Sequence, residues 1–167
     1  MEKLSLLIDG LSNRLGQLFS WLTLGMVIVM ATIVVLRYVF QIGSIALQES
    51  VIYINALIFT FGVGYTLKEQ GHVRVDIFYS RLSHRQRAWD DLCGTLLLLV
   101  PSAVFIIWVS WDYVAISWQI REGSAEASGL PYVYLIKSAL LVLPCLLLLQ
   151  GSSEILKAVV TIRRLDS

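Results

Sequence analysis

The stretch LGQLFSWLTLGMVIVMATIVVL, residues 15–36, contains no charged side chain and lies between Arg14 and Arg37. An α-helix rises about 1.5 Å per residue, so roughly 20 apolar residues cross a hydrocarbon core about 30 Å thick. The 22 residues of this stretch are therefore enough to cross a membrane as a helix. Three further runs are similarly apolar, with Lys137 as their one charge: residues 50–67, 92–111 and 127–153. The sequence thus predicts an all-α integral membrane protein with four transmembrane helices.

The composition of the chain leaves no room for a folded soluble domain. Hydrophobic residues make up 57% of the 167 residues and charged residues 15%, whereas soluble domains average about 25% charged residues. We therefore expect residues 1–167 to form a single membrane domain. The first apolar run is longer than the roughly 7–15 residues of a signal-peptide core, so we interpret it as a retained span. The expected spans cover approximately residues 15–40, 50–68, 89–113 and 130–155.

Lysine and arginine side chains are distributed unevenly between the two sides of the predicted bundle. Cytoplasmic loops of membrane proteins carry an excess of these residues. Ten of the 13 fall on the side that holds both termini and the long loop at residues 68–91, and three fall on the other side: Arg37, Arg121 and Lys137. The sequence therefore predicts that both termini and this loop are cytoplasmic. The basic residues lie at helix ends rather than on one face, which argues against a nucleic-acid partner.

Two connecting segments have helical patterns of their own. In residues 1–14, Leu4, Leu7, Ile8 and Leu11 share one helical face, which predicts a short amphipathic helix lying on the inner leaflet before the first span. In the cytoplasmic loop, Ser83 and Gln86 have the spacing of a capping box. Helix three is therefore expected to begin near His84, and Pro101 within it predicts a kink because proline donates no backbone hydrogen bond.

Polar side chains are rare inside the predicted spans, where they usually mark function. Asn55 in span two and Lys137 in span four are the strongest candidates. Arg37 and Glu49 also lie near the outer face, so we expect an outer charge cluster in which Glu49 pairs with Arg37 or Lys137. Aromatic rings favour the boundary between lipid and water, and three tryptophans are expected to anchor the outer end of span three: Trp108, Trp111 and Trp118.

No set of residues indicates a reaction centre. The two histidines, His72 and His84, both lie in the predicted cytoplasmic loop, whereas a haem held between spans by two histidines needs ligands within the membrane. His72 and Asp76 stand four residues apart and could share a metal, but no further ligands accompany them. We find no nucleophile–base pair and no acidic residue in mid-span of the kind that a proton-coupled exporter requires. The sequence therefore predicts a membrane subunit that is not an enzyme and carries no metal or cofactor.

Several short motifs follow one another in a specific order. RYVF at residues 37–40 ends the first span, Gln48 and Glu49 open the second, and GHVRVD at residues 71–76 follows in the cytoplasm. The fourth span contains Leu130-Pro131, Lys137, Pro144 and Leu149-Gln150. This order resembles the small membrane subunit (DctQ-like, the small permease component) of tripartite ATP-independent periplasmic (TRAP) transporters, over roughly residues 15–157. One position departs from the family: Gln48 stands where many relatives have the first of two acidic residues, so Glu49 alone supplies a carboxylate.

The resemblance implies a role and a set of partners. In these transporters a periplasmic solute-binding protein captures a solute, usually a carboxylate, and a large permease subunit moves it inward with sodium. The small subunit implied here is a non-catalytic scaffold, surrounded by lipid, that holds the large subunit in the bacterial cytoplasmic (inner) membrane. Our candidate structural or interface residues are Arg37, Glu49, His72, Arg74, Asp76 and Lys137.

Two other classes of function stay open. The chain could be the membrane anchor subunit of a respiratory or other membrane enzyme, which a haem absorbance spectrum of the purified protein would reveal. It could also be an autonomous small exporter, which would transport without any partner. The family places solute selectivity in the binding protein and the large subunit, so we do not expect this chain to encode it.

Overall fold

The computed structural model describes residues 2–69 and 83–166, which are helical over most of their length. The candidate residues His72, Arg74 and Asp76 lie outside the described residues. A π-helix, η1, interrupts the third long helix. The elements are α1 Glu2–Tyr38, α2 Ile45–Lys68, α4 His84–Gly94, η1 Thr95–Leu99, α5 Val100–Gln119, α6 Val133–Lys137 and α7 Ala139–Asp166.

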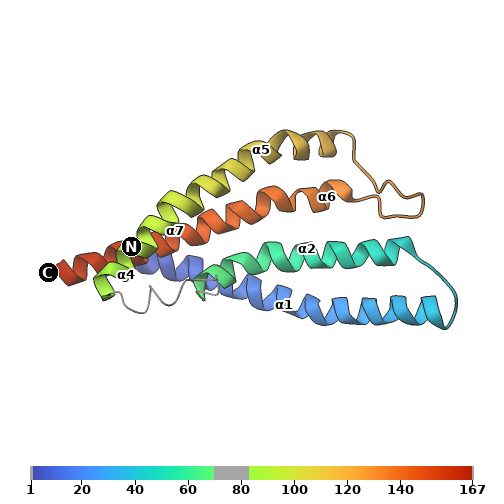
Figure 1. Ribbon diagram of the computed structural model, residues 1–167, viewed down its shortest axis with the longest axis horizontal. Coiled ribbons are helices and arrows are strands. Elements are labelled where there is room, and N and C mark those ends of the chain that lie inside the picture. The colour runs from blue at the N-terminus through green and yellow to red at the C-terminus, as the bar shows by residue number, and fades with distance from the viewer. Residues whose placement is uncertain (1, 70–82, 167) are drawn as a thin grey trace.

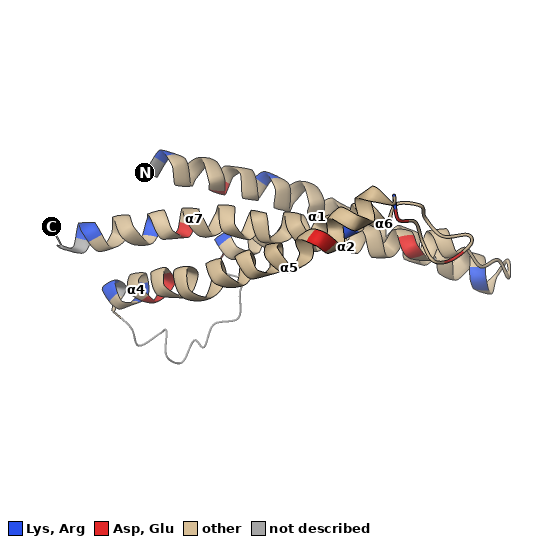
Figure 2. Cartoon of the chain, turned by 90° about the horizontal axis from the view of Figure 1, so that it is seen from above, with Lys and Arg blue, Asp and Glu red and all other residues tan. Residues whose placement is uncertain are grey.

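The helices form an elongated bundle of two hairpins, α1 with α2 and α4–α5 with α6–α7 (Figure 1). α7 contacts α1, α2, α4 and α5 and so joins the two hairpins. Four helical stretches are long and apolar enough to cross a membrane, which confirms the predicted number of spans: Lys3–Tyr38, Ile45–Lys68, Arg85–Gln119 and Val133–Arg164. The two ends of the chain lie at the same end of the bundle, and Figure 2 shows charged residues gathered toward both ends of the molecule.

The N-terminal segment is part of α1 rather than a separate helix. No proline interrupts residues 2–38, and a single helix of 37 residues runs through them. Leu7 is 71% exposed, whereas Ser5 and Ser12 are each 6% exposed. The expectation that residues 1–14 form a separate short helix is therefore wrong. The polar side of the segment meets α7 because α7 supplies hydrogen-bond partners there, and the leucines face outward.

The start of the third long helix agrees with the predicted capping box. The Gln86 amide N–H donates to the Ser83 hydroxyl, and the Ser83 amide N–H donates to the Gln86 side chain at 2.9 Å. Further along, a π-helix, η1, directly precedes α5 and Pro101, and the Val100 amide bonds to the Thr95 carbonyl. A π turn widens the helix, and this relieves the clash that a proline ring makes with the preceding turn.

The fourth long helix is interrupted at Ser138, between α6 and α7. Leu141 and Val142 both donate backbone hydrogen bonds to the Ser138 carbonyl at 3.0 Å, so the helix tightens locally before it continues. Pro144, which follows inside α7, has no N–H to extend the regular ladder. The expected span at residues 130–155 is thus a short helix from Val133 followed by a long one.

Small residues occupy the contacts between helices. A Cβ added to Gly16 would lie 2.5 Å from the Tyr65 Cβ, and one added to Gly151 would lie 3.0 Å from the Leu99 side chain. Lipid tails are as apolar as leucine, so the hydrophobic effect does not drive helices together within a membrane. Membrane helices associate through such close contacts instead. The largest fully buried side chains are accordingly not large hydrophobic ones but Gln150, Pro144, Ser117 and Ser153.

Candidate functional site: two polar clusters that join the helices

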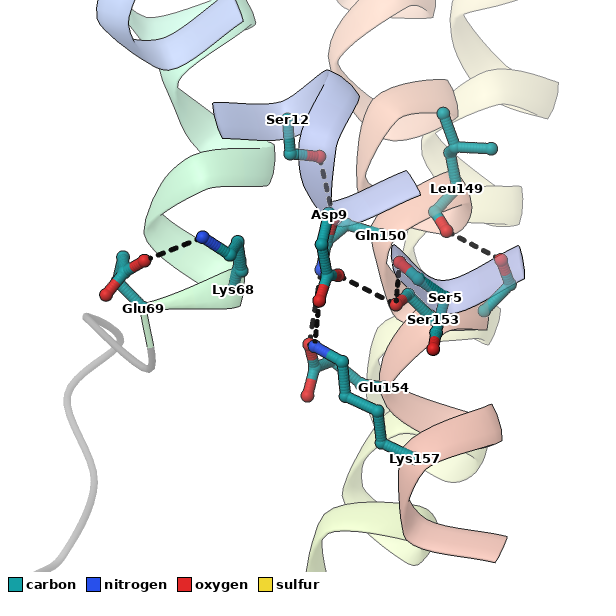
Figure 3. A network of polar contacts seen from close by, with 11 residues as sticks. Ser5, Asp9, Ser12, Lys68, Glu69, Leu149, Gln150, Ser153, Glu154 and Lys157 are labelled. Atoms are coloured by element: carbon teal, nitrogen blue, oxygen red, sulfur yellow. Dashed lines mark hydrogen bonds and ion pairs between the residues drawn. The ribbon is translucent and has the colours of Figure 1, made fainter. Parts of the chain in front are cut away.

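A polar network connects α1 to α7 at the end of the bundle where the termini lie (Figure 3). We call it the α1–α7 network. On α1 its members stand at i, i+4 and i+7, so they share one helical face. Those on α7 stand at i, i+3, i+4 and i+7, so they also share one face and meet the α1 members from the opposite side. The network consists of Ser5, Asp9, Ser12, Gln150, Ser153, Glu154 and Lys157.

Gln150 is the centre of this network and is fully buried. Its Oε1 accepts a hydrogen bond from the Ser12 hydroxyl at 2.6 Å. Its Nε2 donates to Asp9 Oδ1 at 2.9 Å and to Glu154 Oε1 at 3.2 Å. A buried amide is costly unless its polar atoms are paired, and here the carbonyl oxygen and the amide nitrogen both have partners.

Lys157 neutralises part of the negative charge in the α1–α7 network. Its ammonium lies 2.7 Å from Asp9 Oδ2 and 2.8 Å from Glu154 Oε1. The Ser153 hydroxyl donates to Asp9 Oδ1 at 2.8 Å. Asp9 therefore binds three groups of α7 at once, and its side chain is only 14% exposed. These contacts hold α1 and α7 together, and both carboxylate oxygens of Asp9 are bound by side chains of α7.

A second cluster lies at the opposite end of the bundle, around the loop that joins α5 to α6. Arg121 follows α5 in the left-handed region, with φ of 47°. The Glu122 amide then bonds to the Ser117 carbonyl and the Arg121 amide to the Trp118 carbonyl, which is the Schellman pattern at a helix end. This turn places Glu122 beside α6, where its carboxylate lies 2.5 Å from the Lys137 ammonium.

Lys137 also contacts an aromatic ring. Its ammonium lies 3.9 Å from the centroid of the Tyr113 ring, so a cation–π contact supplements the ion pair. The Lys137 hydrogen bond holds the pKa of the Glu122 carboxyl below its usual value. The side chains of Lys137 and Glu122 are 14% and 32% exposed. The charge expected near one end of span four is therefore paired within the chain.

Glu49, near the start of α2 in the other hairpin, binds the same loop. Its carboxylate accepts a hydrogen bond from the Ser124 hydroxyl and one from the Leu130 amide at 2.6 Å. Gly129 lies against the side chains of Ser124 and Glu49, and an added Cβ would fall 2.7 Å from Glu49 Oε1. We call Glu49, Glu122, Ser124, Leu130 and Lys137 the loop cluster.

The pairing expected for Glu49 is wrong in its partners. Glu49 bonds to Ser124 and Leu130, and Lys137 pairs with Glu122 instead. Arg37 is exposed at the end of α1, and no ion pair joins it to Glu49 within the described residues. The expectation failed because loop residues 120–132 fold back over α2 and bring their own donors, which charge positions along the spans do not reveal.

The three tryptophans expected as anchors all lie on α5 with large exposed surfaces. Trp108 and Trp111 are 75% and 60% exposed. Trp118 is also exposed, but its indole N–H donates to the Ser138 hydroxyl at 2.8 Å and its ring packs edge-on against Tyr134. Trp118 therefore has a second contact that sequence reasoning missed, at the break between α6 and α7.

Glu122→Gln is expected to lower the thermal unfolding midpoint of the purified chain at neutral pH, because Lys137 loses its charged partner. The wild type should lose the same stabilisation as pH falls through the folded-state pKa of Glu122, which lies below the roughly 4.3 of a free glutamate. The two proteins should then converge at acid pH. Glu126→Gln, an exposed glutamate of the same loop, is the control. A difference between Glu122→Gln and wild type that does not change with pH would contradict this role of the charge.

The geometry of both clusters is that of a helical membrane component whose polar groups bind one another. A scan against protein-family models matches residues 26–161 to tripartite ATP-independent periplasmic transporters, DctQ component. No curated protein and no solved structure shows a match to the chain. The family match covers most of the chain, including parts of both hairpins and every member of the loop cluster. The chain therefore belongs to the DctQ family, the small membrane component of TRAP transporters.

Proposed function

We propose that this chain is the non-catalytic small subunit of a sodium-coupled TRAP transporter, in which it scaffolds the large permease subunit during uptake of an organic acid. A periplasmic solute-binding protein would deliver the solute to the complex. The chain would lie in the bacterial inner membrane with both termini in the cytoplasm. Family membership supports the proposal that the chain is part of a TRAP transporter. Sodium coupling, the organic acid and the scaffold role rest on the sequence resemblance, and the orientation rests on the charge distribution.

The observation that supports the scaffold role is that the polar side chains of the two clusters bind one another. In the two clusters, carboxylates, amides and ammonium groups bind one another across different helices. An ion-coupling or solute site needs polar groups that are directed into a cavity and are free to bind a ligand. A pocket of about 240 Å³ between α2 and α6–α7 is lined almost entirely by apolar atoms. Rigid internal ties of this kind suit a static support.

Subunit dependence tests the proposal directly. We expect the chain to co-purify in a 1:1 ratio with the large permease subunit of its transporter, and solute uptake to vanish when the chain is omitted. The measurement is sodium-driven uptake into vesicles that contain the large subunit and the binding protein, with and without this chain. Full uptake by the large subunit alone would remove the scaffold hypothesis. Transport by this chain alone would favour an autonomous exporter instead.

The orientation is tested by labelling single cysteines in intact cells. The two native cysteines, Cys93 and Cys145, are exposed and must first be replaced by alanine. Glu69→Cys lies at the end of α2 and Ser128→Cys lies in the loop after α5, at opposite ends of the bundle. A membrane-impermeant thiol reagent is expected to label only the cysteine at position 128 from outside. Labelling of position 69 from outside would overturn the cytoplasmic placement of the termini.

A further inference from the structure

One face of α2 points away from the rest of the bundle and differs in composition from the outward face of α5. α2 packs on α1 and α7 with its opposite side. Residues 48, 52, 55 and 59 are all exposed and follow helical spacing, so they form a continuous stripe along one face. The stripe consists of Gln48, Ile52, Asn55 and Phe59. We call it the α2 outer face.

Asn55 is the unusual member of this face. It stands ten residues after Ile45 in a helix of 24 residues, about 15 Å along the axis, which places it near the middle of the span. Its side chain is exposed and has no hydrogen-bond partner among the residues that the structure describes. Lipid tails offer no donor or acceptor, so an amide at this depth requires a polar group from another protein segment.

The continuation of the same face permits a close approach by another helix. Gly62 lies one turn beyond Phe59, and an added Cβ at this position would meet nothing within 4 Å. The Thr66 hydroxyl, one turn further along, donates to the Gly62 carbonyl, so its hydrogen-bond partner lies within α2. Glycines on membrane helices allow backbones to come together, and interhelical contacts in membranes favour such positions.

The exposed face of α5 provides the contrast. Between residues 104 and 111 its exposed side chains are all aliphatic or aromatic, as expected for contact with lipid. No amide lies among them. The outward faces of α2 and α5 therefore differ: the face of α5 suits contact with lipid, and the face of α2 carries an unpaired amide in mid-span.

We infer that the α2 outer face is the surface on which a transmembrane helix of the large permease subunit packs, with Asn55 hydrogen-bonded to a polar group of that helix. The inference rests on the proposed function, because the large subunit is the membrane partner that a TRAP transporter supplies. It goes further in naming the face and the residue at its centre.

Photocrosslinking with a matched pair of phenylalanines tests the face. Phe59 on α2 and Phe105 on α5 are 67% and 60% exposed, so replacement by benzoylphenylalanine should disturb the fold to a similar extent at each position. In the assembled complex, position 59 is expected to crosslink to the large subunit and position 105 to lipid. An intact complex that crosslinks from position 105 but not from position 59 would overturn the inference and leave the scaffold proposal standing. Crosslinking of position 59 to a second copy of this chain would overturn it as well.

Asn55→Leu tests the hydrogen bond itself. Leucine suits a lipid-facing position, so the isolated variant should fold and melt like wild type. Loss of one interhelical hydrogen bond is expected to weaken association with the large subunit by about 3- to 20-fold. Val109→Leu on α5 is the control and should bind normally. Wild-type association of Asn55→Leu would refute the proposed contact, whereas a wild-type chain that never associates would refute the proposed function and this inference with it.

Discussion

Gly16→Ala is expected to push apart the halves of α1 and α2 that lie toward the termini. The added Cβ would fall 2.5 Å from the Tyr65 Cβ and 2.7 Å from its Cγ. The Tyr65 Cβ is fixed to its backbone, so a change of rotamer cannot relieve the clash and the helices must separate. The stacked rings of Phe19 and Phe61, 4.1 Å apart at their centroids, lie one turn away and would lose their contact. Overpacking of this kind costs about 1–3 kcal/mol.

Two comparisons isolate the clash from other effects of alanine. Gly25 lies in the same helix with nothing within 4 Å of an added Cβ, and Gly25→Ala should leave stability unchanged or raise it by up to about 1 kcal/mol through helix propensity. In a Tyr65→Gly background, Gly16→Ala should cost little, because the opposing Cβ is gone. Thermal unfolding in detergent is measured for the wild type and for all four variants. Equal midpoints for Gly16→Ala and Gly25→Ala would show that the helices do not approach as closely as the structure places them.

The four spans were predictable because hydropathy is a local property of the chain. Charge-free runs of about 20 residues admit few alternatives in a membrane protein. The capping box at Ser83 and Gln86 was predictable for the same reason, since both of its partners lie within one helical turn. Pro101 predicts a kink, whereas the π-helix at Thr95–Leu99 that precedes it was not predictable from the proline alone.

Contacts between distant segments were not predictable from pattern alone. Ser5, Asp9 and Ser12 share a helical spacing that the leucines around them obscured. The leucines of residues 1–14 predict an amphipathic helix with an apolar face toward the inner leaflet, and this pattern gives no indication that α7 meets the polar face. In a bundle surrounded by lipid the apolar side chains have no need to face inward, and the small polar ones bind the neighbouring helix. The partners of Glu49 depended on loop closure between residues 120 and 132, which hydropathy does not describe.

Gln150→Leu is expected to loosen the contact between α1 and α7 more than any other single change of similar volume. Leucine fills nearly the same space, so the effect isolates the hydrogen bonds rather than a cavity. The Ser12 hydroxyl loses its acceptor, whereas the carboxylates of Asp9 and Glu154 each lose one donor and keep Lys157. The Ser12 hydroxyl is thus left buried without a partner, which costs about 1–3 kcal/mol. We expect a clearly lower unfolding midpoint for the isolated chain in detergent.

Gln17→Leu provides the matched control because the same substitution is made on α1 at an exposed glutamine. Its effect on the isolated chain should stay within about 0.5 kcal/mol, the usual range for surface changes. If the α1–α7 network is the tie that makes the chain a rigid support, Gln150→Leu should also reduce the yield of the complex with the large subunit. The sodium dependence of the remaining uptake should not change, because the network then binds helices and not the coupling ion. An altered sodium affinity in a variant that assembles normally would instead place this network in the transport cycle.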